Sequence, residues 1–274
     1  PPLSKEEAIE TTKIYSVAGI APENGVLFNR RPFRAPHHSV SAAGLSGGGS
    51  MPRPGEISLA HNGVLFLDEL PEFQRDALEI LRQPVEDGTV TVSRVASSAT
   101  FPCNIMLVAA MNPCPCGYFG HPTRQCTCNQ FAIDRYLQKV SGPLLDRIDL
   151  HIEVMPVEYE DIAGDGNGEA SSEILKRVIA ARAVQAKRYA GTDVVCNADL
   201  PSAMLRKSCK LSPAANKILK GAFESMGLSA RAYDRVLKVS RTIADLDGSD
   251  TIEAAHVSEA VQYRNLDRKY WYAR

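Results

Sequence analysis

The sequence has neither a membrane-spanning segment nor an export signal. No run of apolar residues approaches the ~20 needed to cross a bilayer, and no secretory signal opens the chain. Neither sign of charge is in excess, because 31 basic residues balance 32 acidic ones. This balance excludes a wholly basic nucleic-acid coat and an acidic disordered tail, and it leaves room only for a local basic patch. We expect no membrane partner.

A second absence concerns nucleotide binding. The phosphate-binding pattern G-x-x-x-x-G-K-[ST] occurs nowhere, and no lysine follows any of the 19 glycines. The stretch GLSGGGSM, residues 44–51, is rich in glycine but lacks the lysine that such a loop needs. The first residue is Pro1 and not methionine, so we expect the chain to be part of a longer or processed protein.

The chain divides into two halves of different texture. Strand-like and helix-like runs alternate up to residue 162, which predicts an α/β domain with a parallel sheet and helices on its faces. Residues 163–172, AGDGNGEASS, have the composition of a linker. Residues 173–274 carry almost no strand signal and predict a helical bundle.

Local patterns predict the individual elements of the first half. A helix is expected over residues 4–19, with Ser4 as its N-cap, Glu7 as the capping-box partner and Gly19 at its end. The patterns further predict buried strands in 63–70 and 104–112, a helix over 71–87, a hairpin over 88–102, helix over 131–148 and a strand over 149–157.

Four helices are expected in the second half, each beginning at Ser or Thr, and the first three end near glycine. They are residues 172–191, 212–227, 229–248 and 251–264, with a short piece near 201–207.

The sharpest chemical signal is GVLFLDEL, residues 63–70, where four apolar residues run directly into Asp68 and Glu69. Ligands of open α/β sheets bind at the carboxyl ends of the strands. Two acids there suit ATP hydrolysis, with Asp68 holding Mg²⁺ and Glu69 orienting the attacking water. The alternative is a strand that ends in a solvated acidic turn.

Three further residues have the chemistry to join such a site. Asn112 follows an apolar strand and offers an amide to a phosphate or to the attacking water, or else it is a turn-former before proline. Arg147, just before a predicted strand, suits an arginine finger, or it pairs with a neighbouring acid. Arg231, in the first turn of a predicted helix, would reach a phosphate, or it is an exposed charge.

In their order and spacing, GVLFLDEL, MLVAAMNP, GPLLDRIDL and LSARAYDRVLKV resemble the Walker B, sensor 1, arginine-finger and sensor 2 motifs of AAA+ ATPases. Residues 30–73, beginning RRPFRAPHHSV, and NPCPCGYFG at 112–120 resemble the magnesium-chelatase-like family, in its competence-associated, ComM-like branch. The resemblance extends from Pro1 to about Arg264.

This resemblance implies an AAA+ core, truncated at its N-terminal side, followed by a helical lid. It also implies ATP and Mg²⁺ as cofactors, and a ring, expected to be a hexamer, because an arginine finger acts on a neighbour's nucleotide. The implied activity is a DNA helicase that promotes branch migration in recombination and transformation. The phosphate-binding loop is expected upstream of Pro1, so we expect this chain alone to bind ATP poorly and not to hydrolyse it.

The cysteines give a second strong signal. Of seven, four crowd into fifteen residues as two C-x-C pairs: Cys114, Cys116, Cys126 and Cys128. Four thiolates this close can form a tetrahedral Zn²⁺ site, and they argue for a reducing compartment, which is the cytoplasm. An iron–sulfur cluster is the less favoured alternative, and His121 is an alternative to one of the cysteines.

The segment from Val26 to Glu56 is locally cationic and rich in glycine, and we expect a flexible loop that contacts the DNA backbone. Its family counterpart is an insertion that faces the pore of a ring, and the hairpin over 88–102 matches a second pore-directed insertion. His37 and His38, in the same segment, are a weak hint of a metal site. The candidate DNA contacts are Arg30, Arg31, Arg34, Arg53 and, at the hairpin turn, Arg94.

Two rival interpretations stay open. The first is a chelatase motor that uses the same ring to help insert Mg²⁺ into a porphyrin. The second is a zinc-bearing adaptor that does not hydrolyse ATP. The basic, glycine-rich segment and the four-cysteine loop favour the DNA motor over both.

Overall fold

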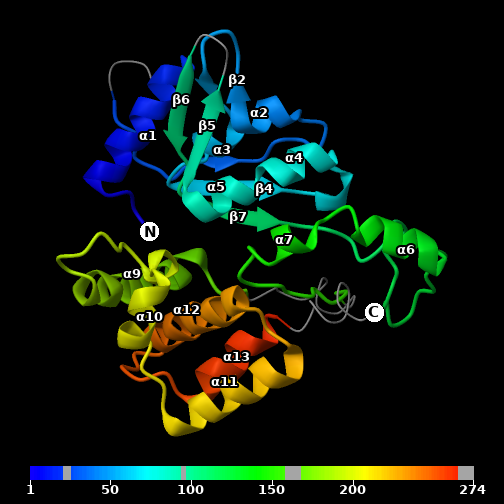
Figure 1. Ribbon diagram of the computed structural model, residues 1–274, viewed down its shortest axis with the longest axis vertical. Helices are drawn as coiled ribbons and strands as arrows, with labels where there is room; N and C mark the ends of the chain where they lie inside the picture. Colours follow the sequence, from blue (N-terminus) through cyan, green and yellow to red (C-terminus); the bar gives the residue numbers. More distant parts are fainter. Residues whose placement is uncertain (21–25, 94–96, 158–167, 265–274) are drawn as a thin grey trace. The chain divides into compact units, whose positions relative to one another are not determined.

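The structure is a computed structural model that describes residues 1–20, 26–93, 97–157 and 168–264 (Figure 1). The chain forms two compact units. One unit is Pro2–Ile148, and the other is Asp149–Arg274 together with Pro1. No helix within the described ranges is long and apolar enough to cross a membrane.

Helix α1 (Lys5–Ala18) opens the first unit as the sequence predicts. Ser4 accepts a hydrogen bond from the Glu7 amide, and the Glu7 carboxylate accepts one from the Ser4 amide at 2.8 Å, which completes the capping box. Gly19 ends the helix with φ +78°. The Tyr15 hydroxyl donates to the Leu59 carbonyl at 2.9 Å and so ties α1 to the rest of the unit.

The sheet consists of three parallel strands in the order β1-β4-β7. These strands are β1 (Phe33–Arg34), β4 (Gly63–Leu67) and β7 (Ile105–Ala109). Leu65 pairs with Arg34 on one side and with Leu107 on the other. Because all three strands run in the same direction, their carboxyl ends meet at one edge of the sheet.

The two faces of this sheet differ in burial. Leu65 and Leu67 are fully buried on one face, whereas Phe33 is 64% exposed and Met106 is 65% exposed on the other. The expectation of strands buried on both faces is therefore wrong for β7 and only partly right for β4. Among the described residues β7 is an edge strand with no covering layer on its outer face, so alternate side chains stay in contact with water.

The segment between β1 and β4 folds into short elements and is not one continuous flexible loop. They are α2 (Ala42–Ser46), β2 (Gly47–Gly48), β3 (Arg53–Pro54) and α3 (Glu56–Leu59). Strands β2 and β3 pair as a small antiparallel hairpin between the two helices. A Cβ on Gly55 would lie 2.3 Å from the Gly47 nitrogen, so this close approach requires glycine.

The helix expected over residues 71–87 is broken into three pieces. They are the 3₁₀ turn η2 (Leu70–Glu72), α4 (Arg75–Ile80) and α5 (Arg82–Asp87). Pro84 has no amide hydrogen to donate to the Ile80 carbonyl, and its ring crowds that carbonyl, so the helix is interrupted at Leu81.

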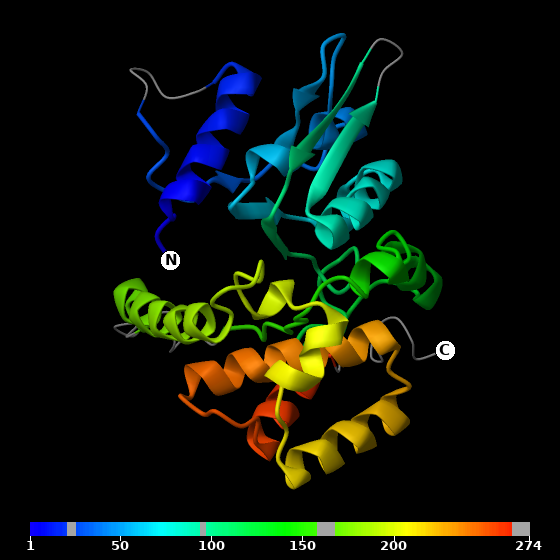
Figure 2. The same ribbon diagram turned by 60° about the vertical axis from the view of Figure 1, so that its left-hand side comes forward.

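Strands β5 (Thr89–Ser93) and β6 (Ser98–Pro102) form the antiparallel hairpin that the sequence predicts. Val90 and Val92 point into the core, and a methyl group of Val92 lies 3.2 Å from the Cβ position of Gly47. The two hairpins are therefore neighbours, and both extend to the same end of the unit in the two views (Figures 1 and 2).

Two expectations in residues 131–157 are wrong. The helical run is divided into α6 (Gln130–Leu137) and α7 (Gly142–Leu145), because Pro143 lacks an amide hydrogen and Ser141 is extended. Residues 149–157 are not a strand, since they pair with no other strand among the described residues. Their apolar side chains are exposed, including Val154 at 85%.

The second unit is helical as expected. Its elements are α9 (Ser171–Arg188), η3 (Asn197–Asp199), α10 (Ser202–Ser208), α11 (Pro213–Met226), α12 (Ala230–Leu246) and α13 (Ala254–Gln262). Ser212 and Ser229 cap α11 and α12, whereas α13 begins after Glu253 and not at a Ser or Thr. The core packs Leu219, Val236 and Ile252.

Candidate functional site

The two predicted acids lie at the carboxyl edge of the sheet, immediately after β4. Asn112 follows β7, the neighbouring strand, at the same edge. The Leu70 amide donates to the Ala110 carbonyl at 3.0 Å, which holds the two strand ends together beyond the last paired residues. The structure thus brings Asp68, Glu69 and Asn112 to one edge, where ligands of parallel sheets bind.

Glu69 has an unusual backbone conformation. Its φ is +52°, and among the described residues the only other non-glycine residue with positive φ is Asn62. The Glu69 amide donates to the Asp68 carboxylate at 2.9 Å. A left-handed glutamate is disfavoured, and such conformations cluster at functional sites, where the surrounding structure holds them.

A third strand contributes a residue that sequence reasoning missed. His38 follows β1 by four residues, and its Nδ1 atom lies 3.1 Å from a carboxylate oxygen of Glu69. Its ring also stacks on that of His37, with centroids 4.0 Å apart. The signal that would find it is its position after a strand, but β1 is only two residues long and lies between prolines.

Tyr136 on α6 lies close to both the acidic edge and the cysteine loop. Burial raises the pKa of Tyr136 to about 12, the charge of Glu72 adds to this effect, and a hydrogen bond at the Asn112 backbone opposes it. The charges of Glu69 and Cys114 also act on it. This tyrosine therefore joins the Asn112 backbone to the residues that surround the acids.

The four clustered cysteines converge on one point. Their Sγ atoms all lie within 4.8 Å of one another, and three of the separations are 3.4, 3.5 and 3.7 Å. A tetrahedral site with Zn–S bonds of about 2.3 Å has edges of about 3.8 Å, so these thiols fit a zinc ion. The cluster consists of Cys114, Cys116, Cys126 and Cys128.

Neither histidine alternative for a metal finds support in the described residues. Nδ1 of His121 accepts hydrogen bonds from the Thr123 and Arg124 amides, and His121 is not part of the cysteine group. His37 and His38 belong to no group of three or more potential ligands within the ranges that the structure describes. Backbone donors near Tyr118 and Thr127 lower the pKa of Cys116 to about 5, which favours the thiolate form that binds metals.

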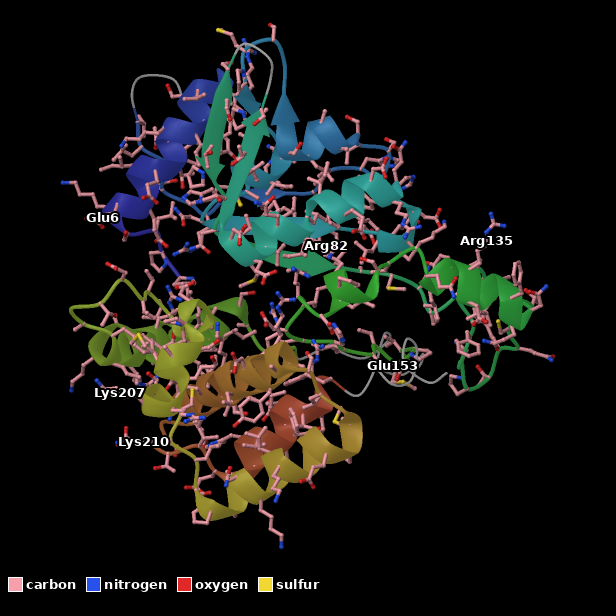
Figure 3. All side chains as sticks on the ribbon, in the orientation of Figure 1. Glu6, Arg82, Arg135, Glu153, Lys207 and Lys210 are labelled. Atoms are coloured by element: carbon pink, nitrogen blue, oxygen red, sulfur yellow. The ribbon has the colours of Figure 1, made fainter. Side chains whose placement is uncertain are left out.

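Arg147 folds back onto its own unit. Its guanidinium donates to Glu86 and to the Pro143 carbonyl, and the side chain is only 10% exposed. It lines a small surface pocket together with residues of α4 and α5, including Arg82, which is labelled in Figure 3. Of the alternatives considered from the sequence, an ion pair is present, but the partner is Glu86 and not Asp146 or Asp149.

Arg231 lies in the first turn of α12, in the helical unit, and its side chain is exposed. Its place in the sequence after the Ser229 cap agrees with the predicted start of this helix.

The candidate DNA-contacting arginines fall into two groups. Arg31 donates twice to Glu7, and Arg34 donates to both carboxylate oxygens of Glu56 at 2.6 and 2.7 Å, so both are held within the unit. Arg30 and Arg53 are exposed. Arg94 lies outside the described residues.

Comparison with known proteins agrees with this architecture. The family model for magnesium chelatase, subunit ChlI, matches residues 1–162, and the model for the C-terminal part of the same subunit matches residues 168–264. The chain belongs to the magnesium chelatase ChlI family, which is AAA+ ATPase-like. Its two units are the AAA+ parallel-sheet core and the helical lid of this family.

Three relatives illustrate the similarity. YifB of Escherichia coli strain K12 is 47% identical over 270 residues, and the competence protein ComM of Haemophilus influenzae is 46% identical over 272 residues. Rv2897c of Mycobacterium tuberculosis is 41% identical over 265 residues. These alignments cover 96–98% of this chain but 52% of each relative, so the chain spans about half the length of the curated relatives it matches.

Proposed function

We propose that the full-length protein hydrolyses ATP at the carboxyl edge of the sheet. The observation that carries this proposal is the meeting of Asp68 and Glu69, after β4, with Asn112, after the adjacent strand β7. Two carboxylates and a neutral amide at such an edge are what Mg²⁺-dependent phosphoryl transfer to water needs.

Each residue has a proposed role. Asp68 would hold the Mg²⁺ ion, which neutralises charge on the phosphates when bound. The Glu69 carboxylate orients and polarises the attacking water. Asn112 contacts the γ-phosphate or that water. The 274 residues contain no phosphate-binding lysine motif, so another part of the protein supplies it, and this chain alone hydrolyses no ATP.

Two arginines extend the site to an oligomer. Arg147 acts as an arginine finger on the nucleotide of a neighbouring subunit in a ring, a hexamer, once it exchanges Glu86 for phosphate. Arg231 of the lid contacts the phosphates as sensor 2. The family membership supports both assignments, because AAA+ proteins generally act as oligomers.

ATP hydrolysis drives movement on DNA, and the activity is that of a branch-migration helicase in the cytoplasm. The relative described as a competence protein supports this choice. Two neighbouring hairpins, β2–β3 and β5–β6, end on the same side of the core unit, and the exposed Arg30 and Arg53 supply charge for phosphates (Figures 1 and 2). Arg31 and Arg34 contribute by holding this segment in place.

The four-cysteine loop holds a structural Zn²⁺ ion. Four thiolates close a tetrahedral site completely, so the ion supplies stability to the loop and takes no part in the chemistry. Because this loop begins directly after Asn112, its order positions that residue.

The test is the Mg²⁺-dependent ATPase rate of the full-length protein with Glu69→Gln. We expect kcat to fall by ~10²–10⁴-fold with ATP still bound, because the amide cannot polarise water. The matched control is Glu72→Gln, three residues on, whose exposed carboxylate pairs with the Lys139 ammonium at 3.3 Å. A Glu69→Gln protein that hydrolyses ATP as fast as the unmodified one overturns the proposal.

The second candidate is a motor for Mg²⁺ insertion into a porphyrin, which the family description favours. Binding of duplex and branched DNA over a salt series, compared with capture of a porphyrin-bearing chelatase subunit, separates the two functions.

A further inference from the structure

His38 makes a contact that the proposed roles of the acids leave unexplained. It is the third element of the carboxyl edge, after β1, and it reaches across β4's end to Glu69 with Nδ1 and the carboxylate oxygen 3.1 Å apart. The His38 side chain is 33% exposed and that of Glu69 is 56% exposed. The pair is thus open to solvent and can separate without disturbing the core.

The chemistry of this contact fixes its direction. An ionised carboxylate only accepts hydrogen bonds, so Nδ1 of His38 carries the hydrogen. The imidazole ring is held in place by His37, with ring centroids 4.0 Å apart, and by the edge of Phe73 at 6.4 Å. A carboxylate oxygen occupied by this donor is not available to accept a proton from a water molecule.

His38 belongs to a segment that is closed at its base. Arg34, at the end of β1, and Glu56, at the start of α3, form a two-point ion pair that brings together the two ends of residues 35–55. Within this segment Leu45 of α2 is fully buried, and the β2–β3 hairpin carries the exposed Arg53. A displacement of the hairpin is therefore transmitted through α2 to His38.

We propose that His38 is a positioning residue that holds the Glu69 carboxylate away from the attacking water, and that DNA bound to the β2–β3 hairpin releases it. The inference rests on the proposed ATP hydrolysis and adds its regulation. Without DNA the hydrogen bond keeps hydrolysis slow, and with DNA the carboxylate becomes available.

The experiment measures kcat and KM for ATP in the full-length protein, with and without DNA. His38→Ala removes the donor, and we expect the DNA-free kcat to rise roughly tenfold, the effect of one charge-assisted hydrogen bond, with KM unchanged. The rate with DNA stays as in the unmodified protein, so stimulation by DNA is abolished. If His38→Ala does not fold, His38→Leu removes the donor while filling the space.

Two further variants separate positioning from a structural role. His38→Asn returns an N–H group near the position of Nδ1, and we expect it to restore the slow DNA-free rate. The matched control is His37→Asn, because Nδ1 of His37 contacts Ser39 at 2.9 Å and not Glu69. It keeps the stimulation by DNA.

The outcomes distinguish this inference from the proposed function. If Glu69→Gln is inactive but the His38 variants match the unmodified protein with and without DNA, the inference is wrong and the ATPase proposal stands. An unmodified ATPase that does not respond to DNA also overturns the inference. An active Glu69→Gln protein overturns the proposed function itself.

Discussion

A buried carboxylate organises the helical unit at the scale of single residues. The Asp245 side chain is fully buried and accepts hydrogen bonds from Arg188, from Arg241 at 3.1 Å and from Asn197 at 2.8 Å. Arg241 is itself only 1% exposed. Asp245→Ala leaves buried guanidinium charge without its partner, and we expect a loss of ~3–5 kcal/mol in the free energy of unfolding.

The measurement is urea unfolding of the chain followed by circular dichroism. The matched control is Asp247→Ala, because the Asp247 side chain is 72% exposed and contacts His256 at 3.2 Å. An exposed pair of this kind contributes about 0–1 kcal/mol. Equal losses of stability in the two variants would contradict the assigned role of Asp245.

The same residue predicts how stability depends on pH. Burial alone would raise the pKa of Asp245, but the hydrogen bonds from Arg188 and Asn197 and the charge of Arg241 outweigh burial and lower it. A carboxyl with a lowered folded-state pKa stabilises the fold above its unfolded pKa, about 3.9, and this contribution is lost as pH falls through the folded value.

We therefore expect the stability difference between the unmodified chain and Asp245→Asn to be full at pH 6 and to shrink below about pH 4. Urea unfolding at a series of pH values measures it. A difference that stays constant down to pH 2 would show that the charge of Asp245 does not matter.

At the scale of elements, two glycines predict opposite effects of the same substitution. A Cβ on Gly63, the first residue of β4, would lie 2.0 Å from the Pro32 carbonyl oxygen, whereas a Cβ on Gly221, inside α11, meets nothing within 4 Å. Gly63→Ala should destabilise the sheet by ~1–3 kcal/mol. Gly221→Ala should stabilise by about 0.5–1 kcal/mol, since alanine favours helix.

Thermal unfolding of the two variants tests the packing of β4 against the chain before β1. The same sign of change in both would contradict this account of the strand.

The cysteine loop gives a prediction about metal content. Protein purified without chelators should contain about one zinc per chain, and Cys116→Ser should lower both the zinc content and the unfolding temperature. Cys196→Ser is the control, because Cys196 lies in the helical unit and contacts Asp199. Elemental analysis that finds no zinc in the unmodified protein, together with no change in unfolding temperature on adding zinc, would rule out the site.

The elements predicted best from sequence are those with chemical signals at their ends. Helix α1 has Ser4 and Gly19, and α11 has Ser212 and Gly227, because caps act over a few residues and are written in them. The failures depend on distant or opposing effects. Pro84 breaks a strongly periodic run, and residues 149–157 have a strand pattern but no partner among the described strands.

At the scale of the whole molecule, the candidate site was partly predictable. Asp68, Glu69 and Asn112 each follow a strong strand pattern, so their position after a strand could be derived from local sequence. The contact of His38 with Glu69 could not, because it depends on the strand order and on a two-residue strand. Nor could the ion pairs of Arg31, Arg34 and Arg147, whose partners are distant in sequence.

DNA affinity of the whole protein should depend on its exposed arginines. Arg30→Ala combined with Arg53→Ala should weaken binding for all sequences and reduce the slope of log affinity against log salt by about 1 for each phosphate that is no longer neutralised. Arg206→Ala, an exposed arginine of α10, is the control. Fluorescence anisotropy over a salt series measures both, and an unchanged slope in the double variant would exclude a role for these arginines in DNA binding.

The central claim is that the carboxyl edge of the sheet is the hydrolytic half of an ATP site. A structure of the full-length protein with Mg²⁺ and a non-hydrolysable ATP analogue tests it most directly. We expect the γ-phosphate beside Asn112, the Mg²⁺ ion within roughly 4–5 Å of Asp68 through a shared water, and Glu69 within about 3 Å of a water facing the γ-phosphate. A nucleotide bound elsewhere, with these three side chains facing only solvent, would contradict the claim.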